Sequence, residues 1–536
     1  MHILLALLVA VPPPDLKAQG EAGLKAIHGE ALSAHVRFLA DDLLEGRGTG
    51  TRGHAIAARY IAGQLQSMGY APAGDNGTYF QKVPFVGMTI QPDGCAVSID
   101  GTALKYGEEA LFQPRAGSAK DEVSGDLVFA GYAISAPEYK YDDFPKDLKG
   151  KIAVIIYGAP RSARDDFFPA AASAVYSDGV RKARLLAERG AVGIITVFTP
   201  AIAAHLPFPF FARQAPFEQM TYREGDKPGA GSALPAVRVP YTMLQRLLAK
   251  SGKSAEQIFK DGPAGKLKPF PLGTRATLKV AAAVRQFDSE NVVGLLRGAE
   301  RASEHVVVSA HLDHLGVGPA MGGDTIYNGA GDNASGVSGM LEVARAFAAQ
   351  PKRPPRSILA LAVTGEEKGL QGSEYFARHP TVPIESIVAN VNLDGVSWQF
   401  EPFDIIALGA EHSTLERAVQ ASLSAMKMKE SPDSQPEQVF FIRSDQYSFV
   451  KRGIPAIFPN AGWQDETGNI EKRKAYDDWW TTNRYHQPSD EWDPKADYEN
   501  MAKEVRADFL MTLAVALDPD KPAWNPGDVF GKLFGK

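Results

Sequence analysis

Residues 357–370 read SILALAVTGEEKGL, an apolar run that is followed almost at once by the adjacent carboxylates of Glu366 and Glu367. A continuous apolar run of this length is typical of a strand that is covered on both faces, as in a parallel sheet. The stretch therefore predicts a buried strand whose end carries two acidic side chains. Burying such a pair is costly unless a positive charge lies nearby, so the pair indicates either a counter-charge or a functional role.

The same pattern repeats along the chain beyond residue 285. Apolar runs predict strands at 291–298, 305–311, 357–363, 387–394, 404–409 and 454–460. Helical periodicity falls between or after them, at 335–350, 369–380, 413–426 and 497–518. Alternating strands and helices predict an α/β fold with a mostly parallel central sheet and helices on both faces.

The first half of the chain divides into three parts. An apolar run within residues 1–20 predicts a signal peptide and export, and residues 21–110 begin the main domain with helices around a Gly-rich turn. Residues 111–270 are β-rich and predict an inserted unit, after which residues 271–536 complete the main domain.

Composition excludes several classes of function. The net charge of -6 argues against nucleic acid as a partner, because phosphate backbones require a basic surface. The single cysteine, Cys95, rules out an intramolecular disulfide and a cysteine zinc site. No segment after the N-terminal run is apolar enough to predict a membrane span. The oligomeric state is left open.

Polar clusters follow the predicted strands at the ends where a parallel sheet gathers its functional groups. They supply His311, Asp313, His314, Asp332, Glu366, Glu367, Asp394, Tyr485 and His486. So many carboxylates at one edge imply a bound cation, and imidazole with carboxylate favours zinc, with manganese or cobalt as alternatives. Two ions fit this donor set better than one. His314 and Lys368 are expected at surface loop positions.

The motifs AHLDH, GAGDNASG, GEEKGLQGS, NLDG, SDQYSFVKRGIPA and YHQPSDEWD occur in this order along the chain. Together they resemble the co-catalytic zinc aminopeptidase family, which includes bacterial leucyl aminopeptidases and glutamate carboxypeptidase II. Residues 111–270 resemble the protease-associated domain that some members carry as an insert. The resemblance implies an exopeptidase that acts on peptide substrates, most simply an aminopeptidase.

The resemblance also implies a role for each site residue. His311 and Asp394 would bind one of two zinc ions, Glu367 and His486 the other, and Asp332 would bridge them. Glu366 would be the general base for a hydroxide that bridges the ions, Asp313 would orient His311, and Tyr485 would stabilise the oxyanion. A cis peptide bond is expected after Asp332.

Three alternatives remain open at this point. A carboxypeptidase or dipeptidase of the glutamate carboxypeptidase type would need arginines for substrate carboxylates, and Arg443 is the one candidate. A glutaminyl cyclase resembles this fold but works with one zinc ion. A non-catalytic receptor of the same architecture should have lost ligands or the base, whereas this chain has the full set.

Overall fold

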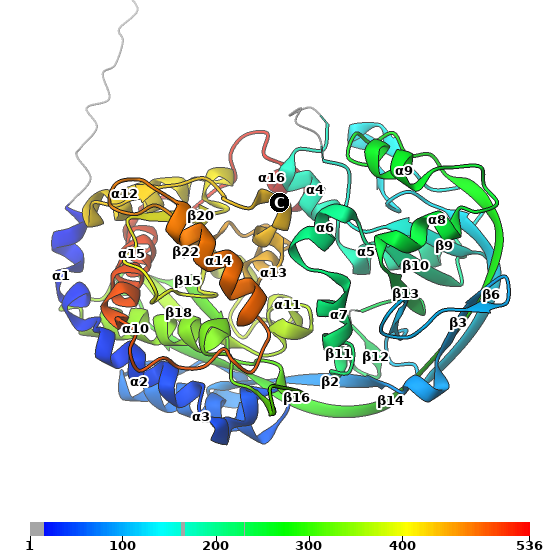
Figure 1. Ribbon diagram of the computed structural model, residues 1–536. Coiled ribbons are helices and arrows are strands. Elements are labelled where there is room, and N and C mark those ends of the chain that lie inside the picture. The colour runs from blue at the N-terminus through cyan, green and yellow to red at the C-terminus, as the bar shows by residue number, and fades with distance from the viewer. Residues whose placement is uncertain (1–14, 162–166, 230, 536) are drawn as a thin grey trace, which may run out of the picture.

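The computed structural model describes residues 15–161, 167–229 and 231–535. Two sheets share one long strand, β14 (Phe270–Leu296), which runs along the bottom of the view beside β2 (Figure 1). Its second half pairs with β2 and β18 in the first sheet, and its first half pairs with β6 and β3 in the second. A single continuous strand therefore connects the two parts of the molecule.

The first sheet carries the predicted βα pattern. Its central strands β18, β15, β19 and β22 are parallel to one another, and antiparallel strands flank them. The strands in spatial order are β11 (Gln219–Glu224), β2 (Phe80–Ile90), β14, β18 (Arg356–Val363), β15 (Arg301–His311), β19 (Ile387–Asn392), β22 (Ala456–Ala461), β20 (Asp404–Leu408) and β21 (Lys429–Glu430).

Helices cover both faces of this sheet, as the continuous apolar strands predict. On one face Val306 and Val308 of β15 share a core with helices α1 (Leu16–Ala26), α2 (Gly29–Leu39), α3 (Arg52–Ser67), α10 (Ser335–Ala349), α12 (Glu416–Met426) and α15 (Tyr498–Leu517). On the other face Val307 packs in a core with Phe376 of α11 (Gln371–Arg378) and Phe449 of α13 (Gln446–Val450). The predicted α/β fold class is confirmed.

The second sheet has its own hydrophobic core, built from residues between Ile90 and Val280. It consists of β4 (Thr102–Ala103), β3 (Ala96–Ile99), the first half of β14, β6 (Lys120–Phe129), β9 (Ile152–Ile156), β10 (Gly193–Val197), β13 (Ala236–Val239) and β5 (Leu111–Gln113). We call this part the second unit. Its identity as a protease-associated domain, and the boundaries 111 and 270, stay predictions.

Shorter helices lie outside the two sheets. The second unit carries α4 (Ala170–Tyr176), α5 (Gly179–Glu188), α6 (Pro200–His205), α7 (Phe208–Gln214), α8 (Leu244–Leu247) and α9 (Ala255–Asp261). The C-terminal part adds α14 (Glu471–Asn483) and α16 (Val529–Phe534). In the described residues no helix combines the length and apolarity that a membrane crossing requires. Residues 1–14 of the predicted signal peptide lie outside the described residues.

Candidate metal centre

Three parallel strands deliver their following residues to one edge of the first sheet. His311 is the last residue of β15, Glu366 follows β18, and Asp394 follows β19. Because β15 is the central strand and pairs in parallel with both others, the three side chains emerge at the same end. The sequence prediction that these clusters converge is therefore correct for the sheet.

Asp332 lies between two groups of candidate metal ligands. One of its carboxylate oxygens lies 3.3 Å from Nε2 of His311, and the other lies 3.2 Å from Nε2 of His486. Nε2 of His311 also lies 3.2 Å from Oδ1 of Asp394, and Nε2 of His486 lies 3.1 Å from Oε2 of Glu367. Two sets of candidate donors thus share the single carboxylate of Asp332.

The donor side chains are nearly all removed from solvent. The side chains of His311 and Glu367 are 1% and 4% exposed, and that of Asp332 is 12% exposed. Anionic groups in such surroundings require a cation, because water no longer screens their mutual repulsion. The donors are imidazole nitrogens and carboxylate oxygens, which suit zinc.

The pKa values of these groups depart from their ordinary values in opposite directions. Burial opposes the charged form of each group, but the carboxylates of Asp394 and Glu366 raise the pKa of His311 well above its usual range. Burial would likewise lower the pKa of His486, yet Glu367 and Asp332 raise it to about 9. In return His486 holds the pKa of Glu367 below its usual value. The Glu367 carboxylate therefore stays ionised.

Glu366 differs from Glu367 although the two are adjacent. Burial raises the pKa of Glu366 well above its usual value, and the nearby carboxylates of Asp394 and Glu367 add to this effect. Oε2 of Glu366 lies 4.0 Å from Nε2 of His311, whereas Oε2 of Glu367 lies 3.1 Å from Nε2 of His486. Glu366 also lines the cavity described below. Glu366 can therefore exchange a proton while Glu367 stays ionised.

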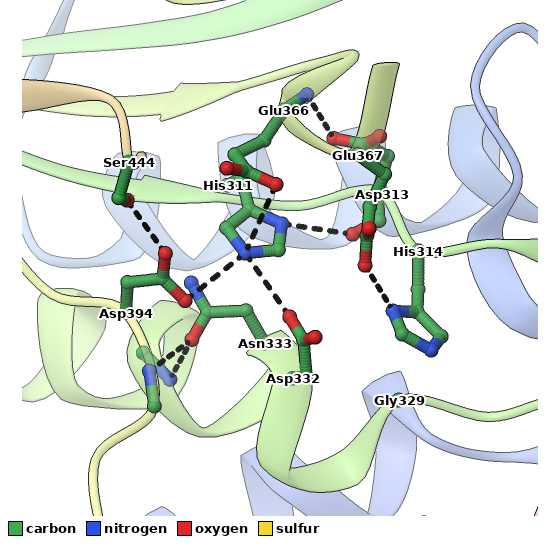
Figure 2. Close-up of polar contacts among 12 residues, drawn as sticks. His311, Asp313, His314, Gly329, Asp332, Asn333, Glu366, Glu367, Asp394 and Ser444 are labelled. Atoms are coloured by element: carbon green, nitrogen blue, oxygen red, sulfur yellow. Dashed lines mark hydrogen bonds and ion pairs between the residues drawn. The ribbon is translucent and has the colours of Figure 1, made fainter. Parts of the chain in front are cut away.

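His314 does not occupy the surface position expected from the sequence, and that prediction is wrong. Its side chain is fully buried, and its Nδ1 lies 2.6 Å from Oε1 of Glu367 (Figure 2). The backbone N–H of His314 donates to the Arg47 carbonyl oxygen, Gly48 forms a β-bridge with His314, and a Cβ added to Gly329 would lie 2.5 Å from the His314 imidazole. The burial comes from segments distant in sequence, which the local pattern does not show. His314 is thus a further possible donor to the Glu367 group.

Lys368, the other residue expected at the surface, is half-buried. Its ammonium group lies 5.5 Å from the ring centroid of Phe217, and burial lowers its pKa. The expected surface position is therefore only partly right, because the Phe217 side chain packs beside Lys368.

Asp313 contacts His311 through its main chain. Nδ1 of His311 lies 3.0 Å from the carbonyl oxygen of Asp313, which leaves Nε2 free to face the centre. The carboxylate that the resemblance assigns to this task is engaged elsewhere. It accepts hydrogen bonds from the Thr49 hydroxyl (2.9 Å) and from the backbone N–H of Glu366 (3.1 Å). Asp313 therefore fixes both His311 and the turn that carries Glu366.

The Asp332–Asn333 peptide bond is cis, as the resemblance implies. The Asn333 side chain accepts hydrogen bonds from the backbone N–H groups of Gly336 and Gly395. The Asp490 carboxylate accepts from the N–H groups of Gly331 and Asp332. These contacts hold the turn before α10 in place and present the Asp332 carboxylate to both groups of donors.

A cavity of about 640 Å³ opens beside the centre, and Asp332, Glu366, Asp394 and His486 contribute to its lining. Tyr485 also lines it and stacks on His486, with ring centroids 3.9 Å apart. Ser444, which the sequence patterns did not single out, donates a hydrogen bond of 2.5 Å to Asp394 (Figure 2). The signal available was its position at the start of the SDQYSF motif.

Part of this chain matches a known protein family. The model of peptidase family M28 matches residues 291–508, a segment that contains all five predicted metal ligands and Glu366. Residues 291–508 belong to peptidase family M28. The M28 segment confirms the peptidase family predicted from the sequence, and it begins after the second unit.

Individual relatives agree with this assignment. The chain is 40% identical over 103 residues to a protein of Pyricularia oryzae named "Probable zinc metalloprotease", covering 19% of this chain and 20% of the relative. It is 27% identical over 311 residues to aminopeptidase YwaD of Bacillus subtilis, covering 56% of this chain and 51% of the relative. The chain thus spans about half or less of these two relatives.

The fold as a whole has a counterpart among solved structures. An aminopeptidase from Aneurinibacillus sp. strain AM-1 superposes with a TM-score of 0.55 at 20% identity, over 94% of this chain and 97% of that one. Because the alignment covers nearly the whole of both chains, the second unit is included in the shared architecture.

Proposed function

We propose that this protein is a zinc-dependent exopeptidase that releases residues from the N-terminus of peptides. The observation that carries the proposal is the Asp332 carboxylate, whose two oxygens face His311 and His486 separately. A further acidic side chain, that of Glu366, lines the cavity beside these three residues. Paired donor sets with a free carboxylate are what metal-assisted hydrolysis requires.

Two zinc ions would be held by the residues already described. His311, Asp394 and Asp332 form one set of donors, and Glu367, His486 and Asp332 form the other. When bound, zinc supplies a Lewis acid that polarises the peptide carbonyl and makes water acidic enough to react near neutral pH. The names of the relatives support zinc, and the shared carboxylate supports a count of two.

Glu366 would act as the general base and then as the general acid. Its carboxylate takes a proton from the attacking water and delivers it to the leaving amine. The raised pKa of Glu366 suits both steps, because the group can hold the proton between them. The Asp313 carboxylate anchors the backbone of Glu366 and so fixes the direction of its side chain.

Tyr485 would donate a hydrogen bond to the oxyanion of the tetrahedral intermediate. Burial raises the pKa of its hydroxyl, so the proton needed for donation stays in place. Its ring is held against His486, which supports a fixed position for the hydroxyl at the cavity.

A carboxypeptidase is the second candidate, and one observation favours it. Two arginines, Arg443 and Arg473, line the cavity, and the sequence motifs pointed only to the first. Arginine binds carboxylates through paired N–H groups. Arg443 already lies 3.2 Å from Oε1 of Gln438, and Arg473 stands 5.3 Å from the ring centroid of Phe400. Both engagements favour structural roles for these arginines, so we place the aminopeptidase first.

Digestion of matched peptides distinguishes the two candidates. Each peptide is offered with a free N-terminus, with an acetylated N-terminus and with an amidated C-terminus, together with measurement of bound zinc. The aminopeptidase proposal expects loss of cleavage on acetylation and retention on amidation. Cleavage of acetylated peptides from the C-terminus would replace it with the carboxypeptidase.

We further propose that the protein is exported, on the basis of the apolar run at residues 3–11. N-terminal sequencing of the protein purified from its native cells would test this. A mature chain that starts after residue 11 supports export, and a chain that retains the run contradicts it.

A further inference from the structure

The second unit reaches into the metal centre through one short helix. Figure 1 shows α7 in the region between the two sheets. The side chain of its last residue, Gln214, lies 2.7 Å from Nδ1 of His486, measured from the amide nitrogen. These two residues are 272 positions apart in the sequence, and Gln214 lies outside the M28 segment.

A second residue of α7 packs beside this contact. The Phe210 ring is nearly parallel to the rings of Tyr485 and His486, at interplanar angles of 7° and 19° and centroid distances of 6.0 Å and 6.1 Å. His486 itself adopts a backbone φ of 54°, in the left-handed region that a residue with a side chain rarely occupies. Side-chain contacts from outside its own loop therefore help to hold His486 in position.

The two histidines of the centre obtain their orienting partner in different ways. His311 contacts the carbonyl oxygen of Asp313, two residues along its own chain segment. His486 contacts a side chain that belongs to another unit. A histidine that binds metal through Nε2 carries its proton on Nδ1 and donates it to an acceptor. The Gln214 amide provides that acceptor oxygen after a half-turn about its Cγ–Cδ bond.

We infer that Gln214 is a positioning residue for His486, so that docking of the second unit sets the affinity of one metal ion and not of the other. The inference rests on the proposed function, because it assumes a metal held by Glu367 and His486. The ion held by His311 and Asp394 depends on contacts within the M28 segment. The second unit therefore contributes a residue, Gln214, to the surroundings of the metal centre.

Chelator titration of the zinc-loaded full-length protein tests the inference without any assay of activity. A chromophoric chelator removes zinc from wild type, Gln214→Ala, Gln214→Glu and Gln219→Ala, and the number and affinity of ions released are recorded. Gln219 is the matched control, because it is a half-buried glutamine of β11 whose side chain contacts the Phe112 carbonyl at 3.4 Å. Circular dichroism and unfolding midpoints check that each variant is folded.

We expect Gln214→Ala to release one ion about 10- to 100-fold more readily and the second as in wild type. Gln214→Glu, which keeps an acceptor, should retain the wild-type affinity or exceed it, and Gln219→Ala should match wild type. Equal weakening of both ions, an unchanged Gln214→Ala profile, or equal losses in Gln214→Ala and Gln214→Glu would overturn the inference. A wild-type protein that binds fewer than two zinc ions would instead contradict the proposed function.

Discussion

The backbone N–H of Glu366 donates a hydrogen bond of 3.1 Å to the carboxylate of Asp313. Because the Asp313 carbonyl oxygen also contacts His311, one residue holds both the candidate metal ligand His311 and the turn that carries Glu366. The relative position of His311 and Glu366 is therefore fixed by a residue of the loop after β15.

Substitution of Glu366 by glutamine should separate chemistry from metal binding. The amide would keep the size of the side chain but could not take up a proton, so we expect peptidase activity to fall at least about a thousandfold. Zinc content should stay at the wild-type level, because Glu366 belongs to neither set of donors. Activity and bound metal are measured together, with Glu108→Gln at an exposed position as the control. Retained turnover would exclude Glu366 as the base.

Substitution of Asp332 by asparagine should affect both ions. The two oxygens of Asp332 face different histidines, and an amide presents only one oxygen and no charge. We expect loss of at least one zinc ion per chain and weaker binding of any that remains. Metal analysis after dialysis provides the measurement, and Asp288→Asn, at an exposed ion pair with Lys82, is the control. Wild-type zinc content would contradict a bridging role.

Arg47 should contribute strongly to stability. Its buried guanidinium donates to the carbonyl oxygens of Leu39, Leu312, Asn328 and Gly329, and so connects three separate segments of the chain. Arg47→Met would leave these acceptors without their donor, and we expect the free energy of unfolding to fall by about 3 kcal/mol or more. Urea unfolding measures the change, and the exposed Arg52→Met variant is the control. A loss below about 1 kcal/mol would show that water replaces these contacts.

The buried Asp143 of the second unit predicts a dependence of stability on pH. Burial raises its pKa from 3.8 to about 6, although N–H groups of Tyr132 and Ile134 and the Tyr141 hydroxyl donate to its carboxylate. The folded state therefore binds the proton more tightly than the unfolded state. The resulting stabilisation is present below pH 3.8 and is lost as the pH rises through about 6.

Asp143→Asn removes this titration. We compare the free energy of unfolding of the variant with that of wild type at each pH. The difference, variant minus wild type, should increase by about 3 kcal/mol between pH 3.8 and pH 7. The prediction concerns this change and not the size of the difference at either pH. Urea titrations across this range give the difference. A difference that does not change with pH would mean that the Asp143 carboxyl titrates at its ordinary pKa.

Local sequence patterns predicted the part of the centre that the sheet itself builds. Apolar runs identified β15, β18 and β19, and the parallel order then placed His311, Glu366 and Asp394 at one edge. The assignment of His486 came from the family resemblance, because its loop approaches the sheet from far along the chain. Such patterns could not predict contacts between distant segments, such as the backbone hydrogen bond between the buried His314 and Arg47.

Gln214 illustrates the same limit in the second unit. Its position at the end of a short aromatic helix gives no sign of a contact with His486, which depends on how the two units pack. The full length of β14 was also not predicted. The apolar pattern indicated a strand at residues 291–298 only, whereas β14 runs from Phe270 to Leu296.

That shared strand restricts how the second unit could be exchanged between related proteins. Residues 282–292 of β14 are held in register against β2, and a shift of one residue would turn every side chain to the opposite face. A chimera that joins a foreign second unit at residue 270 would set a foreign β6 against the first half of the recipient's β14, which pairs with β6 over residues 270–281 in this chain. A workable graft would keep the whole of β14 and β2 from the recipient and make its junctions in the loops of the second unit.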